Sequence, residues 1–215
     1  ALKQKGWRLT HILNTHHHFD HAGGNLELKE QWDCTIIGSG PDADRIPGID
    51  TKVDDGDEFL FGDHSVKVFD VSGHTIGHIA FHFADSDILF SGDALFSLGC
   101  GRLFEGTPAQ MWQSLSKLIK LPDSTIVYCA HEYTQANAAF ALSVEPENEA
   151  LQARSKEIDE LRASGKPTVP SLLGLEKATN PFLRPTSPDL QRNLGLQGAD
   201  LTEVFAETRR RKDNF

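Results

Sequence analysis

The order of apolar and polar residues changes about two thirds of the way along the chain. Up to about residue 132, short apolar runs of β type alternate with turn residues, and several runs show the period of two that is typical of a half-buried strand. The predicted strands cover residues 9–15, 34–39, 65–71, 78–83, 87–92 and 125–130. The acidic, glycine-containing stretch 53–64 predicts hairpin turns between strands.

Two predicted helices interrupt these strands. One follows a histidine-rich run, over roughly residues 23–32. The other begins after Thr107, which is expected to cap it, with Pro108 at the first helical position and Gln110 completing a capping box. Its predicted apolar face consists of Met111, Leu115, Leu118 and Ile119.

Helical patterns replace the strands in the last third of the chain. They cover residues 134–144, 148–164, 187–196 and 199–212, with proline-rich connectors at 165–174 and 180–188. Ser187 before Pro188, and Asp200 before Glu203, are start signals for the last two. We therefore predict a mixed α and β domain over residues 1–132 and a smaller all-helical domain over residues 133–215.

Composition and charge narrow the classes of function. The 215 residues are 39% apolar and 24% charged, as in ordinary globular proteins. A net charge of −10 disfavours nucleic acid as a partner, because phosphate contacts need an excess of Lys and Arg. No apolar run approaches the roughly 20 residues of a membrane helix, and no signal peptide opens the chain. We expect a monomer that binds neither nucleic acid nor membrane.

The three cysteines carry little information about catalysis. Cys34, Cys100 and Cys129 are odd in number and scattered, and none belongs to a C-x-x-C pair. This usage predicts a reducing, cytoplasmic location and excludes a zinc ribbon. No Cys–His signature accompanies them, so we expect none to be catalytic.

Residues that bind metals follow four of the predicted strands. The stretch "NTHHHFDHAGGN" at 14–25 follows the first strand, and "GHTIGH", "SGDALF" and "AHEYT" follow three others. The candidate ligands are His16, His18, Asp20, His21, His74, Asp93 and His131. Loops at the carboxyl ends of strands can converge on one point, so we expect a single metal site there.

The number and kind of these ligands indicate two ions. Imidazole and carboxylate suit Zn²⁺, and also iron or manganese. Seven ligands exceed the need of one tetrahedral ion. His16 and His18 can share one ion, Asp20 and His21 can reach a second, and Asp93 is the candidate bridge between them. Any one of these residues taken alone could instead be a solvated loop side chain that binds no metal.

Five further histidines and one glycine-rich stretch are assigned lesser roles. We take His11, His17, His64 and His82 as structural or surface residues, and His78 as a group that supports a ligand. The stretch "GCGRLFEG" at 99–106 fits neither dinucleotide nor phosphate-loop patterns. We expect its glycines to allow close backbone approach and Arg102 to face an anion.

The four motifs, in this order, resemble the metallo-β-lactamase superfamily. "GCGRLFEGT", the helical tail and "RRRKDNF" resemble the glyoxalase II (hydroxyacylglutathione hydrolase) family from end to end. The resemblance implies an αββα sandwich followed by a small helical domain. It implies one zinc on His16, His18 and His74, a second on Asp20, His21 and His131, and Asp93 between them.

The resemblance also implies a substrate and a reaction. Arg102, Tyr133, Arg209 and Lys212 would bind the glutathione part of S-D-lactoylglutathione, and a hydroxide held by two ions and oriented by Asp20 would attack the thioester in methylglyoxal detoxification. A mononuclear iron persulfide dioxygenase of the same superfamily is the alternative. The chain departs from the family in three respects: Arg102 replaces a common Lys, Phe104 replaces a Tyr found in some members, and the leading strands are absent.

Overall fold

The computed structural model describes residues 1–215, and its strands form two packed sheets and one small hairpin. The smaller sheet has the order β1 (His11–Leu13), β2 (Thr35–Ser39), β3 (Thr51–Val53), and all three strands are parallel. The hairpin consists of β8 (Leu95–Phe96) and β9 (Gly99–Cys100).

The larger sheet has six strands, and the directions of three of them create the site. Its order is β11 (Ser171–Leu172), β10 (Ile126–Cys129), β7 (Ile88–Gly92), β6 (Ile79–Phe83), β5 (His64–Asp70), β4 (Glu58–Phe61). Strand β6 is antiparallel to β5 and to β7, and β10 is parallel to β7. Strands β5, β7 and β10 therefore run the same way and end at the same edge of the sheet.

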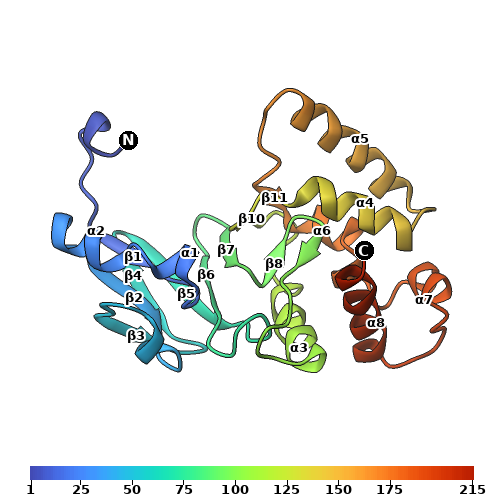
Figure 1. Cartoon of the computed structure of the whole chain (residues 1–215), viewed down its shortest axis with the longest axis horizontal. Helices are drawn as coiled ribbons and strands as arrows, with labels where there is room; N and C mark the ends of the chain where they lie inside the picture. Colours follow the sequence, from blue (N-terminus) through green and yellow to red (C-terminus); the bar gives the residue numbers. More distant parts are fainter.

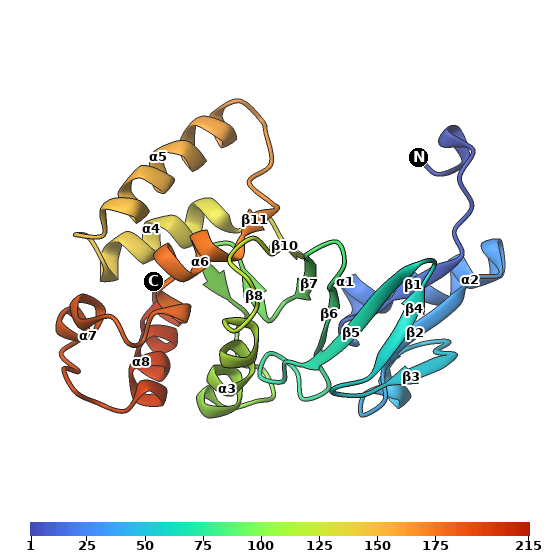
Figure 2. The ribbon, with the colours of Figure 1, turned by 180° about the vertical axis from the view of Figure 1, so that it is seen from behind.

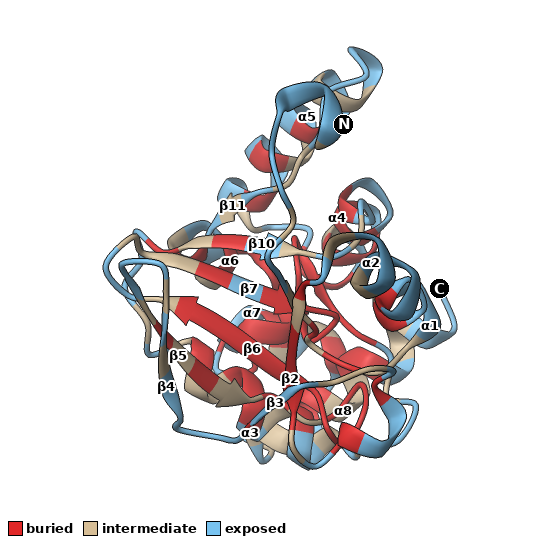
Figure 3. Ribbon diagram, turned by 90° about the vertical axis from the view of Figure 1, so that its left-hand side faces the viewer, coloured by how far each residue is buried: buried red, intermediate tan, exposed pale blue.

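Alternation along the strands separates two apolar layers. Ile79 and Phe81 of β6 pack with Val66 and Val68 of β5 against the smaller sheet. Ala80, between them, faces the opposite layer, which packs against the helices. Figure 3 shows these central strands largely buried. Successive side chains of a strand point to opposite faces, so each strand contributes to both layers.

Helices cover both outer faces. The α-helices are α1 (Phe19–Ala22), α2 (Asn25–Trp32), α3 (Pro108–Leu118), α4 (Thr134–Val144), α5 (Glu149–Ala163), α6 (Leu173–Thr179), α7 (Pro188–Leu194) and α8 (Leu201–Asp213). Short 3₁₀ turns are η1 (Lys3–Lys5), η2 (Ala43–Arg45) and η3 (Pro181–Leu183). Helix α2 packs on β2, while α3 and α8 lie together beyond the larger sheet (Figures 1 and 2). The predicted αββα sandwich with a helical C-terminal part is confirmed.

The structure confirms several elements that were predicted from local sequence signals. Thr107 accepts a hydrogen bond from the Gln110 backbone, and the Gln110 side chain accepts one from the Thr107 backbone, so the predicted capping box is present. Met111, Leu115 and Leu118 of α3 are buried, as its apolar face predicts. Ser187 and Asp200 cap α7 and α8 as expected.

Other elements differ from the predictions. The turn region 53–64 contains β4, a short edge strand whose acidic neighbours hide its pattern. The helix predicted over roughly residues 23–32 is present as α2, but the separate short helix α1 that precedes it was not predicted. The connector 165–174 contains β11 and the start of α6, so the C-terminal part is not all-helical. Strand β11 forms because β10 offers an open edge, which no local pattern reveals.

One apolar core joins the two parts of the chain. Phe182 and Phe205 from the helical part pack in the same buried cluster as Leu89 of β7 and Leu115 of α3. The helical part therefore stabilises the sheet as well as adding surface to it. None of the helices combines the length and the apolar character that a membrane crossing requires.

This shared core predicts one cooperative unfolding transition. Phe205→Ala should lower the free energy of unfolding by about 3–5 kcal/mol, because it leaves a cavity at a fully buried site. Phe205→Leu, which removes less volume, should cost less than about 1.5 kcal/mol. Denaturant unfolding followed by circular dichroism and by tryptophan fluorescence should give coincident curves. Two separate transitions would contradict a common core.

Candidate metal centre

All seven candidate ligands lie together at the edge where the parallel strands end. His16 and His18 follow β1 of the smaller sheet, and helix α1 carries Asp20 and His21. His74, Asp93 and His131 follow β5, β7 and β10 of the larger sheet. The site therefore lies between the two sheets, with donors from both.

Three imidazoles form a first group of donors. The Nε2 atom of His16 lies 3.0 Å from Nδ1 of His18, and Nε2 of His74 lies 3.1 Å from the same Nδ1. Such close approach of ring nitrogens suits a shared cation, because a single proton between two rings can serve only one of the two contacts. These three residues are the ones expected to share an ion.

A second group lies beside the first and is more exposed. Asp20, His21 and His131 place donor atoms within 4.8 Å of one another. The Oδ2 atom of Asp20 is 3.4 Å from Nε2 of His131 and 3.5 Å from Nε2 of His21. The side chain of Asp20 is 60% exposed, so this group opens to solvent.

Asp93 lies between the two groups. Its Oδ1 is 3.3 Å from Nε2 of His21, and its Oδ2 is 3.5 Å from Nε2 of both His74 and His131. One carboxylate oxygen therefore faces the second group only, and the other faces both. This position is the one expected of a bridging carboxylate.

The protonation of the cluster favours a bound cation. Burial, with the charges of the neighbouring histidines, drives the pKa of His16 far below its usual range, and burial lowers the pKa values of His74 and His18. Burial alone would lower the pKa of His21, but Asp93 raises it. Buried atoms His21 Nε2 and Asp93 Oδ1 nevertheless complete no hydrogen bond. The imidazoles of the first group are therefore neutral, and neutral imidazoles packed beside a carboxylate whose Oδ1 completes no hydrogen bond fit a metal ion.

Backbone groups orient two of the ligands. Nδ1 of His74 donates to the carbonyl of Arg102 at 2.8 Å, which leaves Nε2 free to face the cluster. The amide of Asp93 donates to Nε2 of His78 at 3.0 Å, and the His78 ring stacks on His16. His78 thus supports the backbone of Asp93. Burial lowers the pKa of His78 to about 3, so it stays a neutral acceptor.

Close approach at Gly101 makes the contact with His74 feasible. A Cβ at this position would lie 2.1 Å from the carbonyl oxygen of Asp93 and 2.8 Å from the His74 ring. Only glycine fits such a gap. The expectation that glycines in residues 99–106 allow close backbone approach is met here.

A polar network beside the first group was not predicted from the sequence. Nδ1 of His17 donates to Asp42 at 2.8 Å, and Arg45 pairs with both Asp42 and Glu105. Glu105 in turn accepts from the amide of Ile76 at 2.8 Å. The network ties the His16–His18 segment to the loop that follows His74. His17 is structural, as expected, but its buried partner Asp42 directly precedes η2, for which the sequence has no local signal.

A cavity of about 480 Å³ leads away from the ligands toward the helical part. Its walls include the ligands His74 and Asp93 and the cations Arg102, Arg209 and Lys212. Phe96 and Tyr133 also line it, and Tyr133 stacks on His131 with ring centroids 5.0 Å apart. The four residues expected to bind substrate thus line one cavity.

The cations of the last helix divide between two roles. Arg210 and Arg211 pair with Glu207, away from the cavity. Arg209 donates to the carbonyl of Cys100 at 3.0 Å and pairs with Asp213. Burial and the charges of Arg209 and Arg102 lower the pKa of Lys212 to about 8. A cluster of like charges that depresses an ammonium pKa favours an anionic ligand.

The cysteines lie outside this chemistry. Cys34 and Cys100 are buried, and burial raises the pKa values of Cys100 and Cys129 to about 11. Their thiolate forms are therefore scarce at neutral pH, in keeping with the absence of a nucleophilic role.

Fold and ligand set together define the class of protein. The family model described as metallo-beta-lactamase superfamily matches residues 1–131, and the superfamily implies binding of divalent metal. The model described as hydroxyacylglutathione hydrolase C-terminus matches residues 132–215. The chain belongs to the hydroxyacylglutathione hydrolase family.

Relatives and solved structures agree with this assignment. A hydroxyacylglutathione hydrolase of Methylococcus capsulatus is 59% identical and one of Rhizobium etli is 58% identical, each over 100% of this chain and 84% of the relative. ETHE1 from Myxococcus xanthus is 25% identical, with a TM-score of 0.67 over 97% of this chain and 72% of that one. TTHA1623, solved in a di-iron-bound form, is 27% identical, with a TM-score of 0.60 over 85% and 81%.

The network at Asp42 predicts a change in metal affinity. Asp42→Asn should weaken metal binding by about tenfold, because support outside the ligands typically contributes 10–100-fold. Competition with a chromophoric chelator measures this affinity. The matched control is Asp85→Asn, which breaks an exposed His64–Asp85 pair of 3.0 Å. Equal metal affinity in both variants would mean that Asp42 does not orient the ligands.

Proposed function

We propose that the protein hydrolyses S-D-lactoylglutathione and related 2-hydroxyacyl thioesters of glutathione to a 2-hydroxy acid and glutathione. One observation carries the proposal: a single cavity connects the cluster of metal ligands with three cations. Glutathione is a net anion with carboxylates at both ends of its peptide. Its thioester can therefore span the cavity with the scissile carbonyl at the ligands.

We assign the binding of glutathione to the cationic residues that line this cavity. Arg102, Arg209 and Lys212 would attract the carboxylates, and Tyr133 would contact the peptide from its place beside His131. Residues 133–215 would then be the substrate-binding domain and residues 1–132 the catalytic domain. Phe104 cannot donate a hydrogen bond, but its ring lies 5.2 Å from that of His74 and can contact an acyl group.

The ligand set is proposed to hold two divalent cations. His16, His18 and His74 would hold one, Asp20, His21 and His131 the other, and Asp93 both. Such a pair supplies Lewis acidity, which activates water near neutral pH and polarises a carbonyl. Zn²⁺ suits this imidazole and carboxylate set best. Iron and manganese suit it too, and the di-iron form of TTHA1623 makes iron a candidate to measure.

The protein's own groups would orient the attack. Asp20 is the exposed carboxylate of the cluster, and it would accept a hydrogen bond from the attacking water and hold it against the thioester. The leaving thiolate has a parent thiol of pKa ~8.5, so it departs without a dedicated general acid.

The alternative is a mononuclear iron persulfide dioxygenase. It would need one ion, whereas the structure offers donors for two, and the hydrolase relatives at 57–59% identity are much nearer than ETHE1 at 25%. One sample can decide between the two: metal content by mass spectrometry, thioester hydrolysis, and oxygen uptake with a glutathione persulfide. Hydrolysis with two ions supports the proposal, and oxygen uptake with one iron would replace it.

Asp93→Ala should abolish hydrolysis and lower metal content toward one ion per chain. The reason is that this carboxylate offsets charge between both groups of ligands and sets their spacing. Asp63→Ala, an exposed turn position, is the control and should retain activity and both ions. An Asp93 variant with two ions and near-normal turnover would contradict the bridging assignment.

The lowered pKa of Lys212 leads to a prediction for the pH dependence of substrate binding. Its lowered pKa of about 8 means that the ammonium loses its charge as pH rises through 8. The affinity for an unreactive glutathione thioether should therefore fall by up to about tenfold between pH 7 and pH 9. Calorimetry measures this affinity.

Lys212→Arg is the matched variant for this experiment. A guanidinium stays charged throughout this range, so the extra loss of affinity above pH 8 should disappear. Any titration of the ligand itself affects both proteins equally. Identical pH profiles for the two would show that Lys212 does not contact the anion.

A further inference from the structure

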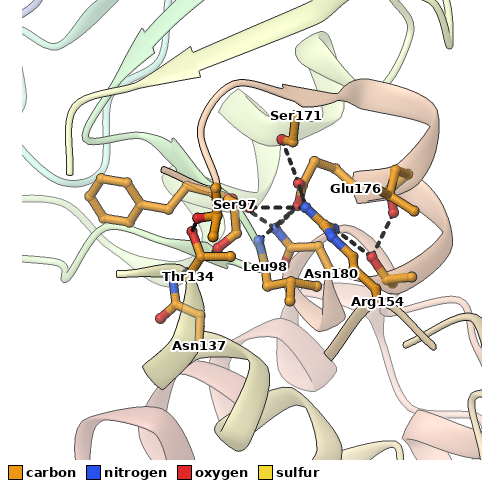
Figure 4. Close-up of polar contacts among 12 residues, drawn as sticks. Ser97, Leu98, Thr134, Asn137, Arg154, Ser171, Glu176 and Asn180 are labelled. Atoms are coloured by element: carbon orange, nitrogen blue, oxygen red, sulfur yellow. Dashed lines mark hydrogen bonds and ion pairs between the residues drawn. The ribbon is translucent and has the colours of Figure 1, made fainter. Parts of the chain in front are cut away.

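A buried ion pair joins two helices of the C-terminal part. Arg154 on α5 and Glu176 on α6 are 6% and 0% exposed, and the guanidinium donates to the carboxylate. A buried pair is tolerable only when its remaining hydrogen-bonding positions are satisfied. Figure 4 shows how this is achieved: the pair sits at the centre of a polar network that includes Ser97, Ser171 and Asn180.

Most of this network is directed at the β8–β9 hairpin. Oε2 of Glu176 accepts from the amide of Leu98 at 2.8 Å, and Arg154 donates to Oγ of Ser97 at 2.9 Å. Asn180, itself bonded to Glu176, donates to the carbonyls of Phe96 and Gly99 at 3.2 and 3.0 Å. The pair and Asn180 therefore hold the backbone of the hairpin through hydrogen bonds that are additional to those between β8 and β9.

The hairpin has a conformation that needs such support. Leu98 is fully buried and has φ of 59°, in the left-handed region that a leucine rarely adopts. Glu176 accepts the amide hydrogen of this residue. Loss of that acceptor would leave a buried N–H unsatisfied and remove a restraint on the strained residue.

The hairpin also forms part of the wall of the cavity. It lies between Asp93 and Arg102 in the chain, and Phe96 and Cys100 line the cavity. The ring of Phe96 lies 5.5 Å from that of Tyr133, and the carbonyl of Cys100 accepts from Arg209 at 3.0 Å. A shift of the hairpin would displace both Tyr133 and Arg209.

We propose that Arg154 and Glu176 are positioning residues for substrate binding: they hold the β8–β9 hairpin so that the wall of the glutathione site keeps its shape. This inference rests on the glutathione site proposed above. The amide of Asp93 is held separately by His78, so the metal ligands should not respond. The expected signature is a change in KM with kcat and metal content preserved.

Two serines provide a matched test. Oγ of Ser97 accepts from Arg154 on the hairpin, whereas Oγ of Ser171 donates to Glu176 from β11, outside it. Each Ser→Ala change removes one hydrogen bond from the same ion pair. Ser97→Ala should raise KM for S-D-lactoylglutathione about threefold to tenfold, with kcat unchanged. Ser171→Ala should leave KM unchanged. Its thermal stability should fall by about as much as that of Ser97→Ala, because each change removes one hydrogen bond from the ion pair.

A direct measurement of the hairpin accompanies the kinetics. Hydrogen exchange of residues 95–101 should become faster in Ser97→Ala and in Glu176→Gln, and stay as in the parent protein in Ser171→Ala. The Glu176→Gln protein should show the largest rise in KM. If it does not fold, the two serine variants still decide the question.

The outcomes separate this inference from the proposal on which it rests. A Ser97→Ala protein with unchanged KM would overturn the positioning role, as would an equal rise in KM in both serine variants. The glutathione site itself is tested by Lys212→Ala. An unchanged KM in Lys212→Ala would contradict the proposed glutathione site. A raised KM in Lys212→Ala together with an unchanged KM in Ser97→Ala would contradict only the role of the ion pair.

Discussion

The structure depends on one cluster of metal-binding groups: the Asp93 carboxylate surrounded by imidazoles at a buried edge between two sheets. Burying such a cluster without a cation costs free energy. The fold brings its members close enough together to share bound cations. Strands β5, β7 and β10 point the same way, so three loops deliver ligands to one place. The smaller sheet then supplies His16 and His18 from the opposite side.

The shape of the cavity depends in turn on the helical part of the chain. The apolar core that contains Phe182 and Phe205 continues under the larger sheet, so the helices are held rigidly against it. Rigid attachment lets polar groups far apart in sequence act on one loop. Arg209 holds the carbonyl of Cys100 while Glu176 holds the amide of Leu98. Substrate affinity and helix packing are thereby coupled through the hairpin, in a segment that carries no metal ligand of its own.

Sequence patterns predicted the elements whose causes are local. The capping box at Thr107 and the buried stripe of α3 depend on residues within one or two turns, and both were predicted correctly. Strand β4 and helix α6 were missed for the opposite reason. Strand β4 is a short edge strand that exists because β5 offers a partner, and α6 begins two residues after Ser171 because β11 must first join β10. Register with a distant strand leaves no local trace.

The sequence by itself determined the donor chemistry: which residue types are present, how they are spaced, and the order in which strands present them. That is enough to indicate metal binding, because imidazole and carboxylate are side-chain groups that bind divalent cations. Only the tertiary structure decided which donors face one another, that Asp93 lies between both groups, and that Asp42 and Glu176 support loops far from them in sequence. The physical reason is distance: a hydrogen bond or an ion pair exists only within a few ångströms, and chain separation says little about it until the sheets and helices have packed.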